Sequence, residues 1–327
     1  MLTNVKIKNF KSIRDLEFSA RRVNVFVGEP NTGKSNIIEA LAFFSAGTFA
    51  SPQGMQEILR FKTTADLFFD QKVANAISID VGDWAMALNF GGGNYQGVFS
   101  WKANATTRVS KAQFIMSHVG FAGGVASVSG ISIRHYVFKA LTAFPNGQPG
   151  VLNPPFGDNL VAVLYTNEAL RQRAGALIRQ AGFRLQIKPA DNELLIAKDV
   201  KDELYSYPWT SVSETLRRAV FLLAVLETNN DATLLLDEPE SNTFPFYTKY
   251  FAERIALDSS NQFFLTTHNP YLLSSVVEKT PVEALNVFVT TMEGFETKLK
   301  RVPDQKLPDL LDLDSAAFFN LPRLVEE

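Results

Sequence analysis

The sequence predicts an α/β fold in which a mixed sheet carries a phosphate-binding loop and is joined by an antiparallel β lobe and a helical lobe. Three observations support this prediction. A β-type run at 23–27 leads into the glycine-rich segment GEPNTGKS at 28–35, and helical spacing of apolar residues follows it. Short β-type runs separated by glycine-rich turns fill residues 76–138. From residue 211 onward, helices and strands alternate, which favours a parallel sheet covered by helices.

Composition narrows the class of protein. The 327 residues fit one large α/β domain with insertions or two smaller domains. With 34 acidic and 32 basic residues, the net charge of −2 gives no overall attraction to nucleic acid or anionic membrane. The absence of cysteine excludes disulfides, thiolate zinc sites and thiol catalysis. The longest apolar run, 219–226, is far shorter than the roughly 20 residues that span a bilayer, so we expect a cytoplasmic protein without a membrane segment.

The order of the expected elements follows from local patterns. Val5 and Ile7 alternate with lysines and predict an opening strand, and helical spacing is clear after the loop at Ile37, Ile38, Leu41 and Phe44. The runs AISIDV, WAMALNF, YQGVFSW and ISIRHYVF predict an antiparallel β lobe. A connector rich in proline and glycine at 145–157 precedes helical patterning at 158–182. Beyond it we expect a helix after Ser211, a strand at 233–236, a helix at 247–257 and a strand at 263–267.

The segment 28–35 has the spacing of a complete phosphate-binding loop. Its glycines let consecutive backbone amides turn toward the β and γ phosphates, and the N-terminus of the following helix adds its positive dipole end. Lys34 supplies a point charge and Ser35 a ligand for Mg²⁺. We therefore expect ATP and Mg²⁺ as cofactors, with the nucleotide bound by Gly28, Glu29, Pro30, Asn31, Thr32, Gly33, Lys34 and Ser35.

Two adjacent carboxylates follow the apolar strand TLLL at 233–236, where open α/β sheets bind their ligands. We expect Asp237 to hold the metal together with Ser35, and Glu238 to act as the general base on the attacking water. His268 ends the next apolar run, and we expect it to act catalytically at the γ phosphate beside the same sheet edge.

Taken together, these motifs resemble those of the ABC-type ATPases, in the RecF, SMC and OLD-like branch often described as AAA-family ATP-binding proteins. The resemblance rests on NVKIKNFKSIRDLEF, VNVFVGEPNTGKSNIIEAL, PPFGDNL, SVSETLRR, LLLDEPESNTFP and FLTTHNPYLL. It implies one ABC-type ATPase domain over 1–327. Its expected lobes are a P-loop and antiparallel β lobe at 1–144, a helical and connector insertion at 145–210, and a third part at 211–327.

In this family two protomers enclose two ATP molecules, and a signature segment of one protomer completes the site of the other. SVSETLRR stands at the matching place, so the resemblance implies a homodimer in which Ser213 reaches the partner's nucleotide. Relatives carry a glycine after this serine, whereas this chain has Glu214. Ser211 and Glu214 also fit a capping box at the start of a helix, and both roles are compatible. Lys11 and Ser12 match a position that touches nucleotide in relatives.

The task of such an ATPase must come from what is attached to it. Only 59 residues follow His268 (327 − 268), and we expect them to be too few for the C-terminal nuclease domain of OLD-like proteins. The leading hypothesis is a stand-alone, dimerising ATPase that gates or senses for a separately encoded effector, a nuclease or toxin, in anti-phage defence. The alternatives are a RecF/SMC-like DNA-binding ATPase in DNA repair, with Arg171, Arg173, Arg179 and Arg184 as phosphate contacts, and a scaffold that binds ATP and hardly hydrolyses it.

Overall fold

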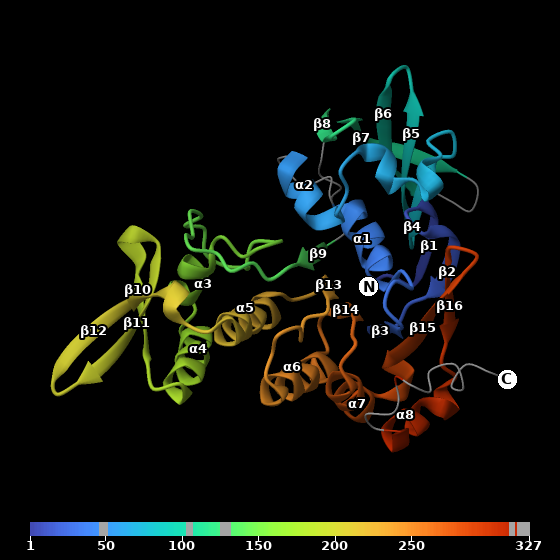
Figure 1. The fold of residues 1–327 in the computed structure, drawn as a ribbon. Helices are drawn as coiled ribbons and strands as arrows, with labels where there is room; N and C mark the ends of the chain where they lie inside the picture. Colours follow the sequence, from blue (N-terminus) through green and yellow to red (C-terminus); the bar gives the residue numbers. More distant parts are fainter. Residues whose placement is uncertain (46–51, 103–106, 125–131, 314–317, 319–327) are drawn as a thin grey trace.

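A six-stranded mixed sheet forms the centre of the computed structural model, which describes the chain except residues 46–51, 103–106, 125–131, 314–317 and 319–327 (Figure 1). Its order is β16-β15-β3-β14-β13-β9, and all pairs are parallel except the one between β15 and β16. The strands are β3 (Val23–Gly28), β9 (Ile133–Tyr136), β13 (Thr233–Asp237), β14 (Gln262–Thr266), β15 (Leu285–Glu293) and β16 (Glu296–Arg301).

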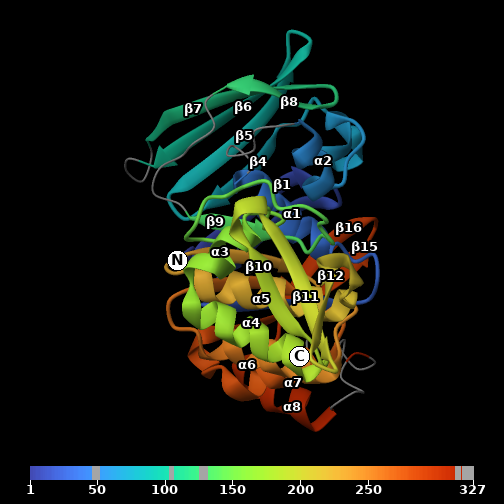
Figure 2. The same cartoon turned by 90° about the vertical axis from the view of Figure 1, so that its left-hand side faces the viewer.

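A seven-stranded antiparallel sheet stands beside the central sheet. Its order is β2-β1-β4-β5-β6-β7-β8, so both the N-terminal hairpin and the predicted β lobe belong to it (Figure 2). The strands are β1 (Asn4–Phe10), β2 (Ile13–Ser19), β4 (Ile77–Val81), β5 (Trp84–Gly91), β6 (Asn94–Lys102), β7 (Arg108–Ser117) and β8 (Gly120–Gly124).

The central sheet is covered on both faces, and its strands are accordingly almost continuous apolar runs. One face packs with the antiparallel sheet, α1 (Lys34–Ser45) and α2 (Pro52–Leu59) in a single core. The other face packs against helices in a second core. These helices are α3 (Leu160–Thr166), α4 (Glu168–Gln180), α5 (Glu214–Thr228), α6 (Pro245–Leu257), α7 (Pro270–Lys279) and α8 (Leu307–Leu313).

A third, three-stranded antiparallel sheet projects from the helical side (Figures 1 and 2). It consists of β10 (Arg184–Lys188), β11 (Glu193–Val200) and β12 (Glu203–Pro208). The pattern along 145–210 predicted only helices and a connector. These strands escaped the prediction because β12 is exposed along its whole length and so lacks the alternation that marks a half-buried strand.

One strand belongs to a different sheet from the one we expected. The run ISIRHYVF was assigned to the antiparallel lobe, but β9 pairs in parallel with β13 at the edge of the central sheet. A strand of four residues carries no sequence signal that identifies its partner, and here the partner strand, β13, begins a hundred residues later in the chain. The other expected strands and helices occur where the patterns place them. The division into three lobes stays a prediction.

Within the residues that the structure describes, no helix combines the length and apolarity needed to span a bilayer.

His135 is a buried titratable group in the central sheet. It lies on β9 opposite Leu235 and is 3% exposed. Neither ring nitrogen has a hydrogen-bond partner among the described residues. Burial lowers its pKa from 6.5 to about 4, against the attraction of Asp237. Protonating this ring therefore means placing an unsolvated charge in the core.

We predict that His135 makes the fold sensitive to acid. Its folded pKa lies below the unfolded value, so its contribution to stability is present above pH 6.5 and is lost as the pH falls toward 4. The loss between pH 7 and pH 4 should be about 3 kcal/mol. In urea unfolding, the free energy of unfolding of His135→Leu relative to wild type should be higher at pH 4 than at pH 7 by this amount. The exposed His118→Leu serves as the control, and an equal pH slope in wild type and His135→Leu would contradict the assignment.

Candidate functional site

The glycine-rich loop leaves the central sheet at its carboxyl edge. β3 is buried along its whole length and ends at Gly28, and α1 begins at Lys34. Gly33 has a φ of +89°, a left-handed conformation that favours glycine. A Cβ at this position would lie 1.9 Å from the Thr297 hydroxyl. Ser12, before the loop, and Thr297, far downstream, leave no room for a side chain at Gly33, and this fixes the shape of the loop.

The ammonium of Lys34 hydrogen-bonds to backbone carbonyls of the loop. The side chain is 5% exposed, and its ammonium donates to the carbonyls of Gly28 at 2.9 Å and Glu29 at 2.7 Å. Burial lowers its pKa, and the attraction of Glu238 and Asp237 offsets part of that effect. An anionic ligand in the loop would offer this ammonium a stronger partner than two carbonyls.

The acidic strand meets the loop directly. The Ser35 hydroxyl donates to Asp237 Oδ1 at 3.0 Å, although the two residues are 202 positions apart. Thr266, at the end of β14, donates its hydroxyl to the same oxygen at 2.6 Å and accepts from the Glu238 amide at 2.9 Å. Thr266 thus fixes both adjacent carboxylate residues, a role that the sequence pattern did not reveal.

Glu238 and His268 form a pair at the same edge. Glu238 has a φ of +46°, which is uncommon for a residue with a Cβ and occurs where surrounding structure enforces it. Its carboxylate accepts from the Ser241 hydroxyl at 3.0 Å, and its other oxygen lies 3.3 Å from His268 Nε2. Burial and the charge of Lys34 lower the pKa of His268, so the imidazole is neutral near pH 7.

A cavity of about 500 Å³ lies over these residues. Glu238 and His268 line it, together with most of the loop and the start of α1: Pro30, Asn31, Gly33, Lys34, Ser35 and Asn36. The predicted residues Gly28, Glu29, Thr32 and Asp237 do not line it. Four further lining residues come from distant segments: Lys11, Ser12, Arg60 and Met292. Lys11 and Ser12 thus lie where the family resemblance implied. The structure brings the expected loop and catalytic residues to one cavity.

Arg60 and Glu39 were not predicted from the sequence. Glu39 on α1 is 2% exposed and accepts from both Lys11 and Arg60. The Arg60 guanidinium also lies 3.9 Å from Asp237. One buried carboxylate therefore orients two cations that line the cavity. No spacing in the sequence links these residues, since they come from β1–β2, α1 and the end of α2.

Glu240 is a third acidic residue close to the site. It is 7% exposed, and one oxygen accepts from the Thr267 hydroxyl and the His268 amide. Its other oxygen has no hydrogen-bond partner in the described part of the chain. Burial raises its pKa to about 7, so this carboxyl is half protonated near neutral pH. Glu240 connects the loop after β13 to the end of β14.

Ser213 lies at the start of α5 and not at the chain's own cavity. The prediction of a capping box from Ser211 and Glu214 is wrong. Ser213 is the N-cap, its Oγ accepts from the Leu216 amide at 3.4 Å, and Ser211 ends a short 3₁₀ helix instead. The extended backbone of Val212 shifts the helix start by two residues.

The Glu214 side chain makes two hydrogen bonds beside the N-terminus of α5. Its carboxylate accepts from Arg218 at 3.4 Å and from the Asn242 amide at 3.5 Å. Arg218 in turn lies over the ring of Phe138, with 4.6 Å between its guanidinium carbon and the ring centroid. These contacts hold the Glu214 carboxylate between α5 and the loop after β13.

The residues at the loop fit a hard divalent cation. Ser35 and Asp237 offer a hydroxyl and a carboxylate oxygen, the ligand types that Mg²⁺ takes beside substrate phosphates. They already lie within hydrogen-bond distance of each other, so both could reach one ion. The described residues contain no cluster of three or more His, Asp or Glu side chains that would form a separate metal centre.

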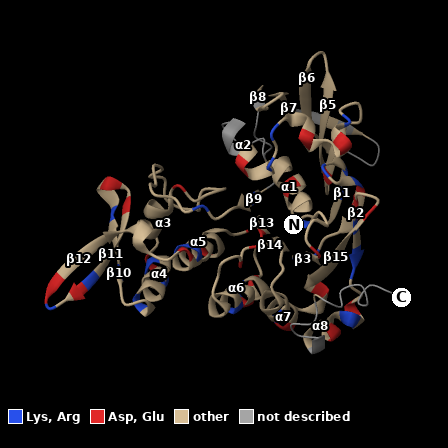
Figure 3. Cartoon of the chain, viewed as in Figure 1, with Lys and Arg blue, Asp and Glu red and all other residues tan. Residues whose placement is uncertain are grey.

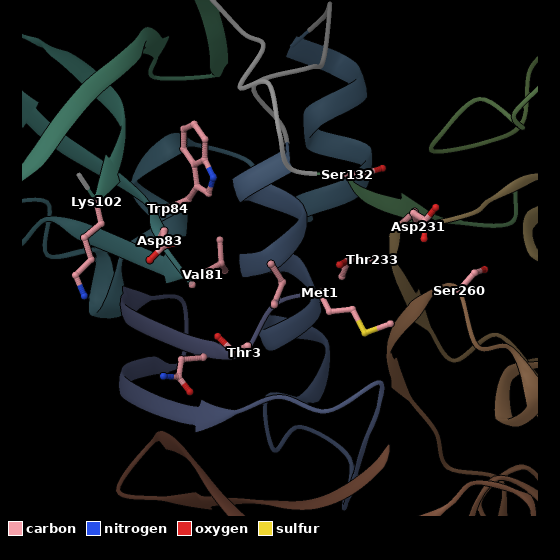
Figure 4. A pocket seen from close by; sticks show the side chains of 14 residues that line it. Met1, Thr3, Val81, Asp83, Trp84, Lys102, Ser132, Asp231, Thr233 and Ser260 are labelled. Atoms are coloured by element: carbon pink, nitrogen blue, oxygen red, sulfur yellow. The ribbon is translucent and has the colours of Figure 1, made fainter. Parts of the chain in front are cut away.

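A larger cavity of about 560 Å³ lies at the opposite edge of the central sheet (Figure 4). Trp84, Asp83 and Lys102 line one side of it, and Asp231, Thr233 and Ser260 line the other. Thr233 begins β13, so this cavity faces the amino end of the strand that carries Asp237 at its carboxyl end. None of the predicted site residues line it.

Two segments of the chain match family models. Residues 1–88 match a model described as "AAA ATPase domain". Residues 166–274 match one described as "AAA domain, putative AbiEii toxin, Type IV TA system". The first segment contains the phosphate-binding loop, and the second contains Ser213, the acidic strand and His268. No curated protein is significantly similar to the chain in sequence.

Solved structures of SMC heads share the fold. An SmcHead bound to the C-winged helix domain of ScpA aligns with a TM-score of 0.51 at 13% identity, over 93% of this chain and 99% of that one. A Smc head domain derived from Pyrococcus furiosus, bound to the C-terminal domain of ScpA, gives 0.50 at 13% identity over 95% and 98%. Residues 1–88 and 166–274 thus resemble AAA ATPase domains. The chain as a whole has the fold of the SMC head, which confirms the predicted fold class and the predicted family resemblance.

We predict that Gly33→Ala abolishes ATP binding. The added Cβ would overlap the Thr297 hydroxyl, and alanine disfavours a φ of +89°, so the loop amides would turn away from the phosphates. Isothermal titration calorimetry with ATP measures the loss. Gly91→Ala is the matched control, because a Cβ there meets no atom within 4 Å. Wild-type affinity in Gly33→Ala would show that the loop does not cradle the phosphates.

Proposed function

We propose that this chain is a cytoplasmic ATPase that closes as a homodimer around ATP and thereby gates or senses for a separately encoded effector, a nuclease or toxin of anti-phage defence. The observation that carries the ATPase part is the convergence of the loop, Glu238 and His268 on one cavity, with Asp237 hydrogen-bonded to Ser35 of the loop. The matched AAA segments support the same activity.

The roles within one protomer follow from the contacts. Lys34 leaves the carbonyls of Gly28 and Glu29 to bind the β and γ phosphates, while the loop amides from Glu29 to Ser35 surround them. Ser35 and Asp237, which lie 3.0 Å apart, would hold Mg²⁺. When bound, this ion would neutralise charge on the phosphates and stabilise the charge that develops during phosphoryl transfer.

Glu238 is the general base in this proposal. Its carboxylate is about two-fifths exposed at the cavity, so a water molecule can reach it. The imidazole of His268 lies with Nε2 3.3 Å from the Glu238 carboxylate and keeps that carboxylate at the edge of the cavity. Abstraction of a proton from the water then produces the nucleophile that attacks the γ phosphate.

The position of Ser213 supports the proposed homodimer. This residue is at the N-terminus of α5 and does not line the chain's own cavity, so it can serve a nucleotide only in another protomer. A helix N-terminus suits a γ phosphate, because its free amides and dipole favour an anion. The tether of Glu214 to Arg218 and Asn242 supports closure, since it holds this carboxylate to the side of the helix end.

The effector is the least direct part of the proposal. Its support is the description of the model matched by 166–274, which names a toxin and a Type IV TA system. Further support comes from the two SMC heads, whose structures contain a bound domain of a separate protein, ScpA. A head of this fold can therefore bind a separate protein, as the proposed coupling to an effector requires.

The DNA-binding alternative has weaker support. Arg173 pairs with Glu227 at 2.5 Å and Arg184 with Asp199 at 2.7 Å, so two of the four expected phosphate contacts are already used within the chain. Arg171 donates to the Tyr165 carbonyl. Charges of both signs are mixed along α4, α5 and β10–β12 (Figure 3), in contrast to the basic stripe that nucleic-acid binding requires.

We predict opposite effects of two substitutions in the site. Lys34→Ala should lose ATP affinity, because the phosphates lose their buried cation. Glu238→Gln should keep ATP affinity, lose turnover and accumulate as an ATP-dependent dimer, because the base is gone and the phosphate contacts remain. Calorimetry, phosphate release and analytical ultracentrifugation measure the three properties. The exposed Glu283→Gln is the control, and equal turnover in Glu238→Gln and wild type would reject the role of the base.

We also predict that the full-length chain carries its effector in the native host. Tagged Glu238→Gln purified with ATP should retain a nuclease or toxin that wild type releases as it hydrolyses ATP, and mass spectrometry identifies it. Recovery of a lone homodimer, with no change in phage resistance on deletion of the neighbouring genes, would contradict effector gating. ATP-dependent duplex binding that weakens steeply with salt would instead favour the DNA-binding alternative.

A further inference from the structure

The β15–β16 hairpin forms a wall of the nucleotide site. We infer that its two buried threonines, Thr290 and Thr297, are positioning residues that hold the phosphate-binding loop in its binding shape. This inference rests on the proposed binding of ATP by the loop. It assigns a role to a region beyond both family-model matches, which end at residues 88 and 274.

Thr290 holds the first half of the loop. It is 1% exposed, lies on β15 opposite Gly28 and donates its hydroxyl to the Val27 carbonyl at 3.1 Å. The Thr32 hydroxyl lies closer, at 2.7 Å, and itself donates to the Glu29 carbonyl at 2.8 Å, so the single Thr290 proton is shared between the Thr32 oxygen and the Val27 carbonyl. The Thr290 Oγ1 atom lies 2.4 Å from the place of a Cβ on Gly28. Thr290 thus fixes the residue where the strand becomes the loop.

Thr297 holds the second half. It is also 1% exposed, and its hydroxyl lies 2.6 Å from that of Ser12, while its amide donates to the Ser12 carbonyl at 2.8 Å. Asn36, in the first turn of α1, donates to the Ser12 hydroxyl at 2.6 Å. Thr297 therefore joins the hairpin, the β1–β2 turn and the helix that begins at Lys34 around Gly33.

Hydroxyls matter here because both meet polar partners: Thr32 of the loop for Thr290, and Ser12 of the β1–β2 turn for Thr297. Valine can replace a buried threonine with little change in shape where the hydroxyl makes no hydrogen bond. The Thr290 and Thr297 side chains, in contrast, each contact a second hydroxyl. Met292 of the same hairpin lines the cavity, so the hairpin reaches the ligand space as well as the loop. Loss of a hydroxyl should therefore leave the fold intact and loosen the loop.

The experiment compares ATP affinity and steady-state hydrolysis of the full chain in four variants. Thr297→Val and Thr290→Val remove one hydroxyl each, and we expect the Kd for ATP and KM to rise about 3- to 10-fold with kcat near the wild-type value. Thr297→Ser restores the hydroxyl and should bind ATP as wild type does. Thr280→Val is the matched control, because Thr280 is buried and its hydroxyl makes no hydrogen bond among the described residues. Thermal unfolding is recorded for each.

The outcomes separate this inference from the proposed function. Weaker ATP binding in both loop-facing valine variants, with rescue by Thr297→Ser and none of the effect in Thr280→Val, supports it. Wild-type affinity in Thr297→Val and Thr290→Val overturns it while ATP binding by wild type stands. An equal loss in Thr280→Val, or no rescue by serine, also overturns it. If wild type and Lys34→Ala bind ATP equally weakly, the proposed function itself fails. Should Thr297→Val not fold, Thr290→Val decides alone.

Discussion

The lateral register of three parallel strands is the constraint on which the site depends. Phe26 of β3, Thr266 of β14 and Asp237 of β13 lie in one row across the sheet. Because parallel strands end at a common edge, this row places the loop after β3 next to the carboxylates after β13. The Thr266 hydroxyl, between them, fixes Asp237 and the Glu238 amide together. A slip of one residue in this register would point Asp237 to the other face of the sheet.

Burial sets the electrostatics of this edge. Lys34 is almost fully buried, and its ammonium has only backbone carbonyls and two nearby acids to balance its lost hydration. Desolvation and the charge of Lys34 lower the pKa of the more exposed His268, and burial brings Glu240 to a pKa of about 7. Desolvated charges interact more strongly with a ligand than exposed ones do, because water no longer screens them. The cavity therefore combines a buried ammonium with the Glu238 carboxylate and the His268 imidazole.

The site is assembled from segments that lie far apart along the chain. The β1–β2 turn supplies Lys11 and Ser12, the end of α2 supplies Arg60, and β15–β16 supplies two threonines and Met292. Glu39 on α1 accepts from both Lys11 and Arg60 and so orients these two cations. Each contact is a hydrogen bond or ion pair in a partly buried place, where an unmade bond is costly. The loop consequently depends on the whole central sheet and not on its own glycines alone.

The sequence by itself determined the elements and the chemistry. Glycine and lysine spacing at 28–35, the carboxylates after an apolar strand and the histidine after the next one are local patterns with local physical causes, and they predicted the loop, Asp237, Glu238 and His268. Only the tertiary structure decided which strands pair, so β9 joins the central sheet and β10–β12 form a sheet of their own. It also decided that Ser213 and not Ser211 caps α5, and that Thr266, Thr290, Thr297 and Arg60 surround the loop. The reason is that pairing and side-chain contacts between distant segments depend on the packing of the whole chain, which no short stretch of sequence encodes.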